Sequence, residues 1–169
     1  VRYPARFQLI LAANPCPCAR IRPQDCVCSS LEKRRYLGKL SGPLLDRVDL
    51  RVQMHAVRAG AFAAEAAEST AAVRHRVAQA RGAAAERWGP HGFSTNAEVT
   101  GVLLRRRFRL AAQVMAPLKA AMERGLISIR GADRSLRVAW TLSDLAGRTA
   151  PNLDDVSVAL SVRPAEVST

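Results

Sequence analysis

The sequence has few aromatic residues and no long apolar run. Phe, Trp and Tyr make up 5% of the 169 residues, whereas 49% of the residues are hydrophobic. A core built from this composition must consist of Ala, Leu and Val, which favours close-packed helices over a large sheet. Because no run of about 18 apolar residues occurs, no membrane-spanning segment is expected. The start, Val-Arg-Tyr-Pro, has neither an initiator Met nor a signal-peptide pattern, which predicts a piece of a longer protein.

Acidic residues are scarce relative to basic ones. The chain has 14 Asp and Glu against 26 Lys and Arg, giving a formal net charge of +12. Charge of this size favours a polyanionic partner such as nucleic acid. A coding bias toward Arg and Ala is the alternative source of the charge, and no basic and aromatic stripe of the single-strand-binding kind is present.

Two segments in the first third of the chain have the pattern of strands. Residues 7–13 are a short apolar run that stops at Asn14-Pro15, and this predicts a buried strand. Residues 48–57 alternate apolar and polar side chains, which predicts a second strand. Between them we predict a helix over residues 31–40, capped by one of two serines at 29 and 30, and a helical turn over 44–47.

The chain after Gly60 has only helical signals. N-cap candidates are Ser69, Thr95 or Asn96, and Asn152, while Gly125 and Gly147 mark helix ends. The predicted helices span residues 70–87, 97–107, 110–124, 130–146 and 153–160. The predicted organisation is therefore a strand-containing part over 1–60, a linker and long helix over 61–95, a helical domain over 96–163 and a disordered tail over 164–169.

The four cysteines form two C-x-C pairs separated by seven residues: Cys16, Cys18, Cys26 and Cys28. Four thiolates can surround one Zn²⁺ tetrahedrally, and such a site would be structural because no coordination position stays open. The alternatives are thiols without a metal and a redox disulfide. Local clustering, as opposed to a disulfide framework along the chain, also predicts a cytoplasmic location.

Arg47 is a candidate for binding a phosphate. It lies between the predicted helical turn and the second predicted strand, where its guanidinium could reach a phosphate on a neighbouring molecule. The alternative is that Arg47 pairs with the flanking Asp46 and Asp49.

A basic run opens the helix predicted over residues 130–146. Its members, at helical spacing, are Arg130, Arg134 and Arg137. A cation near a helix start is mildly unfavourable, so a nearby anion such as a phosphate is one explanation. A solvated basic face is the other.

Three ordered motifs resemble those of the Mg-chelatase-like AAA+ ATPases of the ComM/YifB type. They are YPARFQLILAANPCPC over 3–18, SGPLLDRVDL over 41–50 and LRVAWTLSDLAG over 136–147, joined by the second cysteine pair and by Arg35-Tyr36. The resemblance runs from Tyr3 to Arg163. It implies an α/β fold class: the C-terminal end of an AAA+ P-loop ATPase core with its last two strands, followed by an all-α lid. Ala19 departs from the family, which often has Gly there, and Trp140 replaces a residue that is often basic.

The resemblance also implies roles for individual residues. Asn14 corresponds to sensor 1, which orients the attacking water, and Arg47 to the arginine finger, which reaches ATP in the neighbouring subunit. Arg130 corresponds to sensor 2 of the lid, with Arg134 as the alternative. The cofactors implied for the full-length protein are ATP and Mg²⁺, while the structural Zn²⁺ considered for the cysteines rests on their spacing and not on the resemblance.

The implied function is the C-terminal part of an ATP-hydrolysing motor. Such motors assemble identical subunits into a ring, here expected to be a hexamer, and the DNA-acting members of the family work as helicases or branch-migration factors in competence. The sequence contains no G-x-x-x-x-G-K-[ST] motif, so the chain alone is not expected to hydrolyse ATP. The alternatives are a non-catalytic regulatory or nucleic-acid-binding module that retains the fold, and an inactive truncated gene product.

Overall fold

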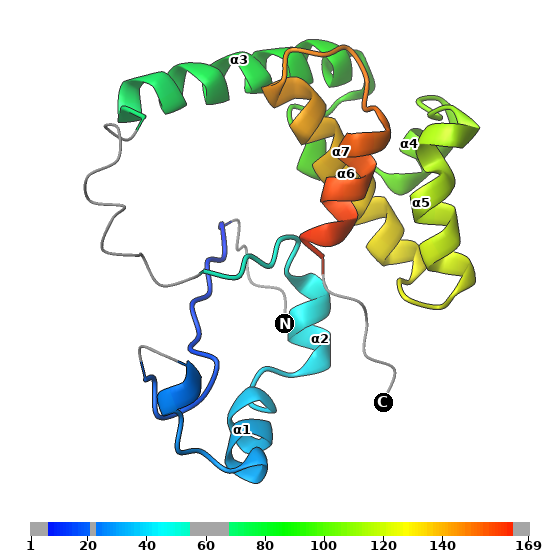
Figure 1. Ribbon diagram of the computed structural model, residues 1–169. Helices are drawn as coiled ribbons and strands as arrows, with labels where there is room; N and C mark the ends of the chain where they lie inside the picture. The colour runs from blue at the N-terminus through cyan, green and yellow to red at the C-terminus, as the bar shows by residue number, and fades with distance from the viewer. Residues whose placement is uncertain (1–6, 21–22, 55–67, 164–169) are drawn as a thin grey trace, which may run out of the picture. The chain divides into compact units, whose positions relative to one another are not determined.

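The computed structural model describes residues 7–20, 23–54 and 68–163 (Figure 1). The chain divides into two compact units, one of residues 1–48 with 53–62 and one of residues 49–52 with 63–169. Within the described ranges, every regular element is a helix. The first motif's residues 3–6, residues 55–57 of the second predicted strand, the start of the predicted linker over 61–67 and the tail over 164–169 lie outside the described residues.

The first unit contains a short 3₁₀ turn, η1 (Pro23–Asp25), and two helices, α1 (Ser30–Leu37) and α2 (Gly42–Arg47). Ser29 caps α1 through a capping box: its hydroxyl accepts the Glu32 N–H at 3.3 Å, and the Glu32 carboxylate accepts the Ser29 N–H at 2.7 Å. These hydrogen bonds from Ser29 hold the pKa of Glu32 below its ordinary value. The helices predicted in this part are confirmed, with slightly different bounds.

The two predicted strands are not formed in the part of the chain that the structure describes. Residues 7–13 and 48–54 are extended or bent backbone without a ladder. Their large apolar side chains are exposed: Phe7, Leu9, Ile10, Leu11, Leu50, Val52 and Met54. A strand is held by hydrogen bonds to a neighbouring strand, and these two segments do not pair with each other. The expectation of an α/β core is therefore not met by the described residues.

The second unit is all-helical, as predicted. Its helices are α3 (Thr70–Trp88), α4 (Gly101–Arg106), α5 (Ala112–Glu123), α6 (Ile129–Leu145) and α7 (Leu153–Ser161), with 3₁₀ turns η3 (Gly89–His91) and η4 (Asn96–Glu98). Ser69 and Asn152 cap α3 and α7, as their sequence positions predicted. Gly125 and Gly147 both have φ of +67° after α5 and α6, a conformation that costs other residues strain.

The helix predicted over residues 97–107 is the exception. It is broken into η4 and α4, because Thr100 caps a new helix by accepting the Leu103 N–H at 3.4 Å. The chain thereby turns so that Gly101 approaches α6 closely. A Cβ at Gly101 would lie 1.8 Å from a carboxylate oxygen of Asp133, so only glycine fits there without a shift of that side chain.

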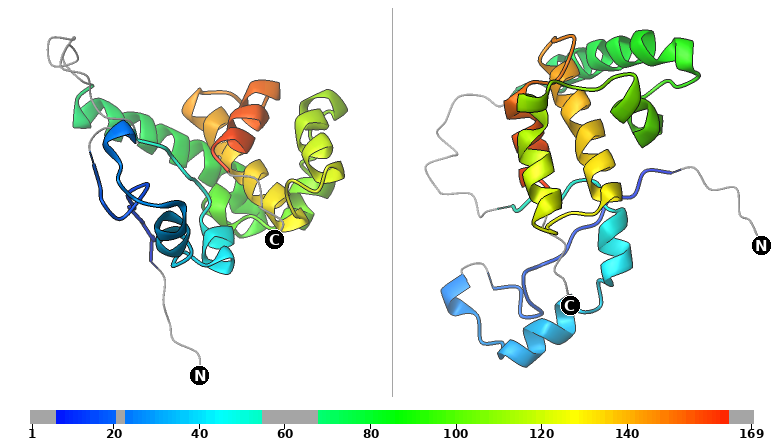
Figure 2. Two further views of the ribbon diagram at one scale, coloured as in Figure 1. Left: turned by 60° about the horizontal axis from the view of Figure 1, so that its bottom comes forward. Right: turned by 90° about the vertical axis from the view of Figure 1, so that its right-hand side faces the viewer.

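The core of the second unit is built around α6. This helix packs against α3, α4 and α7, and α5 packs against α7 (Figures 1 and 2). The buried hydrophobic residues are Ala84, Trp88, Val99, Leu104, Leu118, Ile127, Ala132, Leu136, Ala139, Trp140, Val156 and Ala159. No helix in the described ranges is long and apolar enough to span a membrane.

The prediction of a core made only of Ala, Leu and Val is wrong, because Trp88 and Trp140 are buried in it and Phe108 packs against it. Trp88 is 0% exposed and Trp140 is 4% exposed. The Trp88 ring lies 4.6 Å from the Phe108 ring and 5.3 Å from the Trp140 ring, centroid to centroid, in edge-to-face geometry. Edge-to-face pairs add about 0.5–1.5 kcal/mol beyond their buried area. The departure of Trp140 from the family pattern is thus a packing change.

Candidate functional site

Arg47 ends α2 with its side chain exposed to solvent. Its Nη1 donates a hydrogen bond of 2.6 Å to the carbonyl of Pro43, one turn earlier in the same helix. Of the two carboxylates weighed as partners, Asp49 lies 3.5 Å from the guanidinium of Arg134, and the Asp46 side chain lies outside the description. A guanidinium has five N–H donors, so a single neutral acceptor leaves most of them available for an anion.

Asn14 is the second predicted site residue in the first unit. It is exposed and lies directly after the apolar segment of residues 7–13, at the start of the cysteine loop. Its side-chain amide can both donate and accept a hydrogen bond, which is the chemistry needed to orient a water molecule.

The three arginines at the start of α6 do not share one environment. Arg130 is exposed in the first turn, two residues after the N-cap Ser128. The Arg134 side chain is 16% exposed and forms the ion pair with Asp49. Arg137 donates from Nε to the Val99 carbonyl at 2.8 Å. The three arginines therefore do not form one solvated basic face. Arg130 is the one of the three whose side chain is exposed to solvent.

The four cysteines converge in the first unit. Cys16 Sγ lies 3.3 Å from Cys18 Sγ and 3.5 Å from Cys26 Sγ, and the latter two sulfurs are 3.7 Å apart. With Cys28 included, all four sulfurs lie within 4.8 Å of one another, and none is in a disulfide. Cys16 is buried and the other three are half-buried. The two cysteine pairs therefore lie close enough together for all four sulfurs to face one point.

The thiols of this cluster differ in acidity. The backbone N–H of Arg20, followed by the Cys16 thiol, lowers the pKa of Cys18 to about 6. Burial, followed by the contact with Cys18, raises the pKa of Cys28 to about 12. A cluster that contains one easily formed thiolate has the donor chemistry of a soft-metal site.

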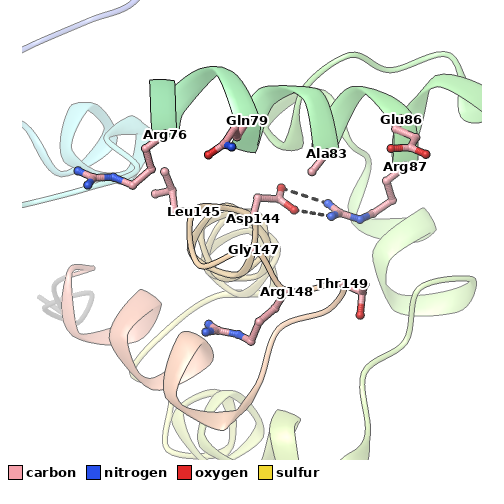
Figure 3. A pocket seen from close by; sticks show the side chains of 10 residues that line it. All are labelled: Arg76, Gln79, Ala83, Glu86, Arg87, Asp144, Leu145, Gly147, Arg148 and Thr149. Carbon is pink, nitrogen blue, oxygen red and sulfur yellow. Dashed lines mark hydrogen bonds and ion pairs between the residues drawn. The ribbon is translucent and has the colours of Figure 1, made fainter. Parts of the chain in front are cut away.

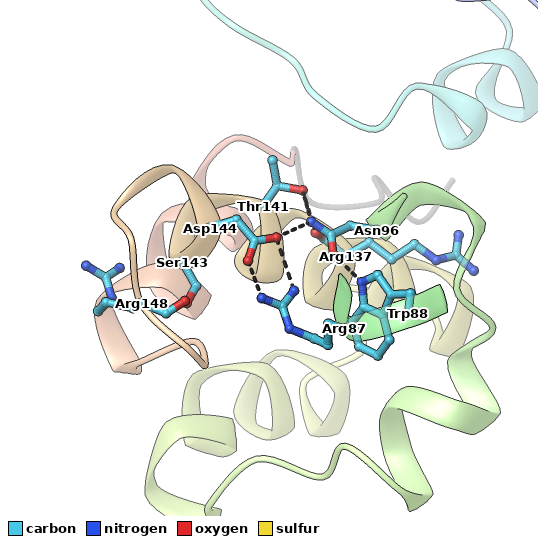
Figure 4. A network of polar contacts seen from close by, with 8 residues as sticks. All are labelled: Arg87, Trp88, Asn96, Arg137, Thr141, Ser143, Asp144 and Arg148. Atoms are coloured by element: carbon cyan, nitrogen blue, oxygen red, sulfur yellow. Dashed lines mark hydrogen bonds and ion pairs between the residues drawn. The ribbon is translucent and has the colours of Figure 1, made fainter. Parts of the chain in front are cut away.

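A buried polar network in the second unit was not predicted (Figure 4). Asp144, whose side chain is 0% exposed, pairs with both terminal nitrogens of Arg87, one of them at 3.1 Å. Asn96 donates to the same carboxylate at 2.8 Å and to Thr141 at 3.1 Å, and accepts from the Trp88 indole N–H at 2.6 Å. The network joins α3, η4 and α6 at one point.

One signal in the sequence could have found this network. Asp144 follows Leu136 and Trp140 at intervals of four residues, so a carboxylate falls on the buried stripe of α6. A carboxylate in that position has to be paired, because an unpaired buried charge is strongly unfavourable. Arg87 completes the arrangement by lying 4.4 Å over the Trp140 ring.

A pocket of about 580 Å³ lies between α3 and the end of α6 (Figure 3). Its cations are already paired: Arg87 with Asp144, Arg76 with Glu68 at 2.6 Å, and Arg148 with the buried Asp155. Because each of these cations faces a carboxylate, the pocket does not have the uncompensated positive charge of a phosphate site.

Comparisons with known proteins extend over both units. The family model described as "Magnesium chelatase, subunit ChlI" matches residues 1–62, and the one described as "Magnesium chelatase, subunit ChlI C-terminal" matches residues 67–163. An uncharacterized protein of Mycobacterium tuberculosis is 70% identical over 161 residues, which are 95% of this chain and 32% of that protein. The competence protein ComM of Haemophilus influenzae is 32% identical over 87% of this chain and 28% of its own length. YifB of Escherichia coli is 33% identical over 86% of this chain and 28% of its own length.

The helical unit with its buried aromatic cluster thus corresponds to the C-terminal domain of a magnesium chelatase subunit of AAA+ type. The chain belongs to the Mg-chelatase-like family that includes ComM and YifB. It spans about a third of the length of the curated relatives that it matches.

Proposed function

We propose that this chain is the C-terminal part of a ring-forming AAA+ motor that hydrolyses ATP and acts on DNA. The observation that carries the proposal is the exposed guanidinium of Arg47, whose one hydrogen bond among the described residues is to a backbone carbonyl. Because the chain covers about a third of its relatives' length, the activity is proposed for the full-length protein that contains it.

In the proposed reaction, Arg47 and Asn14 have different roles in ATP hydrolysis. ATP with Mg²⁺ supplies the phosphoryl group to be transferred. Arg47 donates to phosphate oxygens of the nucleotide held by the neighbouring subunit, where its planar fork matches the geometry of phosphate. Asn14 orients the attacking water through its amide. A finger supplied from a neighbouring subunit requires contacts that repeat from one subunit to the next, which favours a closed ring, here a hexamer.

Residues 7–11 and residues 50–54 each carry exposed large apolar side chains. Exposed apolar side chains that recur along one segment are typical of a surface that another segment covers. The apolar run over residues 7–11 is typical of a strand packed on both faces, whereas the alternation over residues 50–54 is typical of a strand packed on one face. We infer that these segments pair with strands of the nucleotide-binding half in the full-length protein.

Arg130 is proposed as the sensor 2 residue, in preference to Arg134. The reason is that the Arg134 side chain is mostly buried, whereas that of Arg130 is exposed at the start of α6. Replacing Arg130 with alanine in the full-length protein is expected to lower ATP turnover by roughly 10²-fold, the usual cost of losing one donor to a developing negative charge. Steady-state ATP hydrolysis measures this effect. The matched control is Arg106→Ala, an exposed arginine at the end of α4; equal losses in both variants would contradict the assignment.

The proposed partner is DNA. It is supported by the net charge of +12 and by the printed name of one relative, a competence protein. We expect ATP hydrolysis by the full-length protein to be stimulated by DNA, and the subunits to assemble into a ring when nucleotide is bound. Hydrolysis measured with and without DNA, together with sedimentation in the presence of nucleotide, tests both points. DNA binding with no hydrolysis under any condition would favour the non-catalytic nucleic-acid-binding module instead.

The affinity for DNA is expected to depend on salt. Contacts between arginines and phosphates release counterions, so log K should fall linearly with log salt concentration, by about 0.9 per phosphate contact on a duplex. Fluorescence anisotropy with one labelled duplex at several salt concentrations gives this slope. A slope of zero would remove phosphate contacts as the source of binding.

A further inference from the structure

The cysteine cluster has the dimensions of a metal site. With zinc–sulfur bonds of about 2.3 Å, the edges of a regular sulfur tetrahedron are roughly 3.8 Å long. The three separations among Cys16, Cys18 and Cys26 are 3.3, 3.5 and 3.7 Å, and Cys28 completes a group that spans no more than 4.8 Å. Four soft sulfur donors at these spacings match Zn²⁺ better than a hard cation, which prefers oxygen.

The backbone around the first pair is bent to bring the sulfurs together. Ala19 has φ of +50°, in the left-handed region, and its N–H donates to the Cys16 carbonyl at 3.3 Å. A residue with a Cβ is strained in this conformation. Such strain persists only where the surroundings over-determine it, and it clusters at ligand sites.

The described residues of the first unit do not form a hydrophobic core around this loop. Among residues 7–20, 24–45, 47, 48, 53 and 54, Cys16 is the only buried one, and α1 has no buried residue. Segments without a core of their own are commonly held by a disulfide or a structural metal. All four cysteines are free, so the disulfide is not formed in this structure.

We propose that Cys16, Cys18, Cys26 and Cys28 bind one Zn²⁺ as four thiolates in a closed structural site. The site would connect the residues after Asn14 to the N-terminus of α1. Cys16 lies two residues after Asn14, and Cys28 directly precedes Ser29, the N-cap of α1. Bound zinc would therefore hold the backbone that follows Asn14 close to the N-terminus of α1. The metal site stands on the sulfur geometry alone and does not depend on the proposed motor function.

The direct test measures metal and thiols on the full chain purified without chelators. Elemental analysis is expected to give about one zinc per chain, and thiol titration to give four cysteines that react only after a chelator removes the metal. Replacement of zinc by Co²⁺ is expected to produce the strong visible absorption of tetrahedral cobalt thiolates, a readout that needs no variant. Four freely reactive thiols without metal, two disulfides, or iron with sulfide would each overturn the proposal.

Variants locate the ligands. Cys16→Ser and Cys26→Ser, one from each pair, are each expected to lose the bound zinc during dialysis against a weak chelator. Asp25→Asn is the matched control, since it changes the residue beside Cys26 and leaves all four thiols in place. Full zinc retention in either serine variant, or equal loss in the control, would contradict the four-thiolate site. Because these readouts are independent of ATP hydrolysis, a failed motor test leaves them unaffected.

Discussion

Replacing Arg47 with alanine in the full-length protein is expected to reduce ATP turnover by about 10³-fold or more while nucleotide binding is retained. The reason is that a finger supplied from a neighbouring subunit stabilises charge that develops only as the phosphoryl group is transferred. Arg47 fits this task because it is exposed at the end of α2 and holds a single neutral acceptor, the Pro43 carbonyl. Turnover is measured by phosphate release, and binding by titration with a fluorescent nucleotide.

Two further variants separate a finger from a general charge effect. Arg47→Lys keeps the positive charge but removes the planar fork, so it should restore only a small part of the activity. Arg34→Ala, at an exposed arginine in the last turn of α1, removes the same charge from the same unit and should leave turnover nearly unchanged. Unchanged turnover in Arg47→Ala, or a matching loss of nucleotide affinity, would refute the assignment.

Replacing Asp144 with alanine is expected to cost about 3–5 kcal/mol of the free energy of unfolding of the helical unit. Removing one partner of a buried ion pair leaves the other charge uncompensated. Arg87 is 13% exposed in its side chain, so its guanidinium would lose its carboxylate without gaining full hydration. The Asn96 amide would lose one of its two acceptors at the same time and keep only the Thr141 hydroxyl. Chemical denaturation followed by the fluorescence of the buried tryptophans measures the loss.

The matched control for this prediction is Asp154→Ala. Asp154 is an exposed carboxylate in the first turn of α7, where its favourable interaction with the helix dipole is worth about 1 kcal/mol or less. Asp144→Asn is expected to fall between the two, since it keeps an acceptor but removes the charge. Equal stability of the Asp144→Ala and Asp154→Ala variants would show that the network does not hold α3 to α6.

The helices could be predicted because their boundaries are local chemistry. Ser69 and Asn152 satisfy N–H groups within three residues of themselves, and Gly125 and Gly147 supply the positive φ that ends a helix. Strands have no such local signal. The alternation over residues 48–57 indicates two unlike environments, but a ladder needs a second chain segment at the right place, and none of the described residues provides one.

In the candidate site, too, the features that depend on neighbouring residues could be predicted, and those that join distant residues could not. The cysteine cluster followed from spacing, because two close pairs on a short loop can meet without help from the rest of the fold. The ion pair of Arg134 with Asp49 and the network around Asp144 could not be derived, since each joins residues far apart in the sequence. The roles of Asn14, Arg47 and Arg130 stay predictions, because they concern a nucleotide held partly by other subunits.

Helix α3 is anchored at one end only. Its buried residues are Ala80, Ala84 and Trp88, while every side chain from Thr70 to Gln79 is exposed, and the helix extends beyond α6 and α7 in Figure 1. At 1.5 Å per residue, the arm from Trp88 to Thr70 is about 27 Å long, so a rotation of the bundle by about 10° carries the far end through about 5 Å. A small tilt of the bundle would therefore move the exposed end of α3 by more than the contact distance between two side chains.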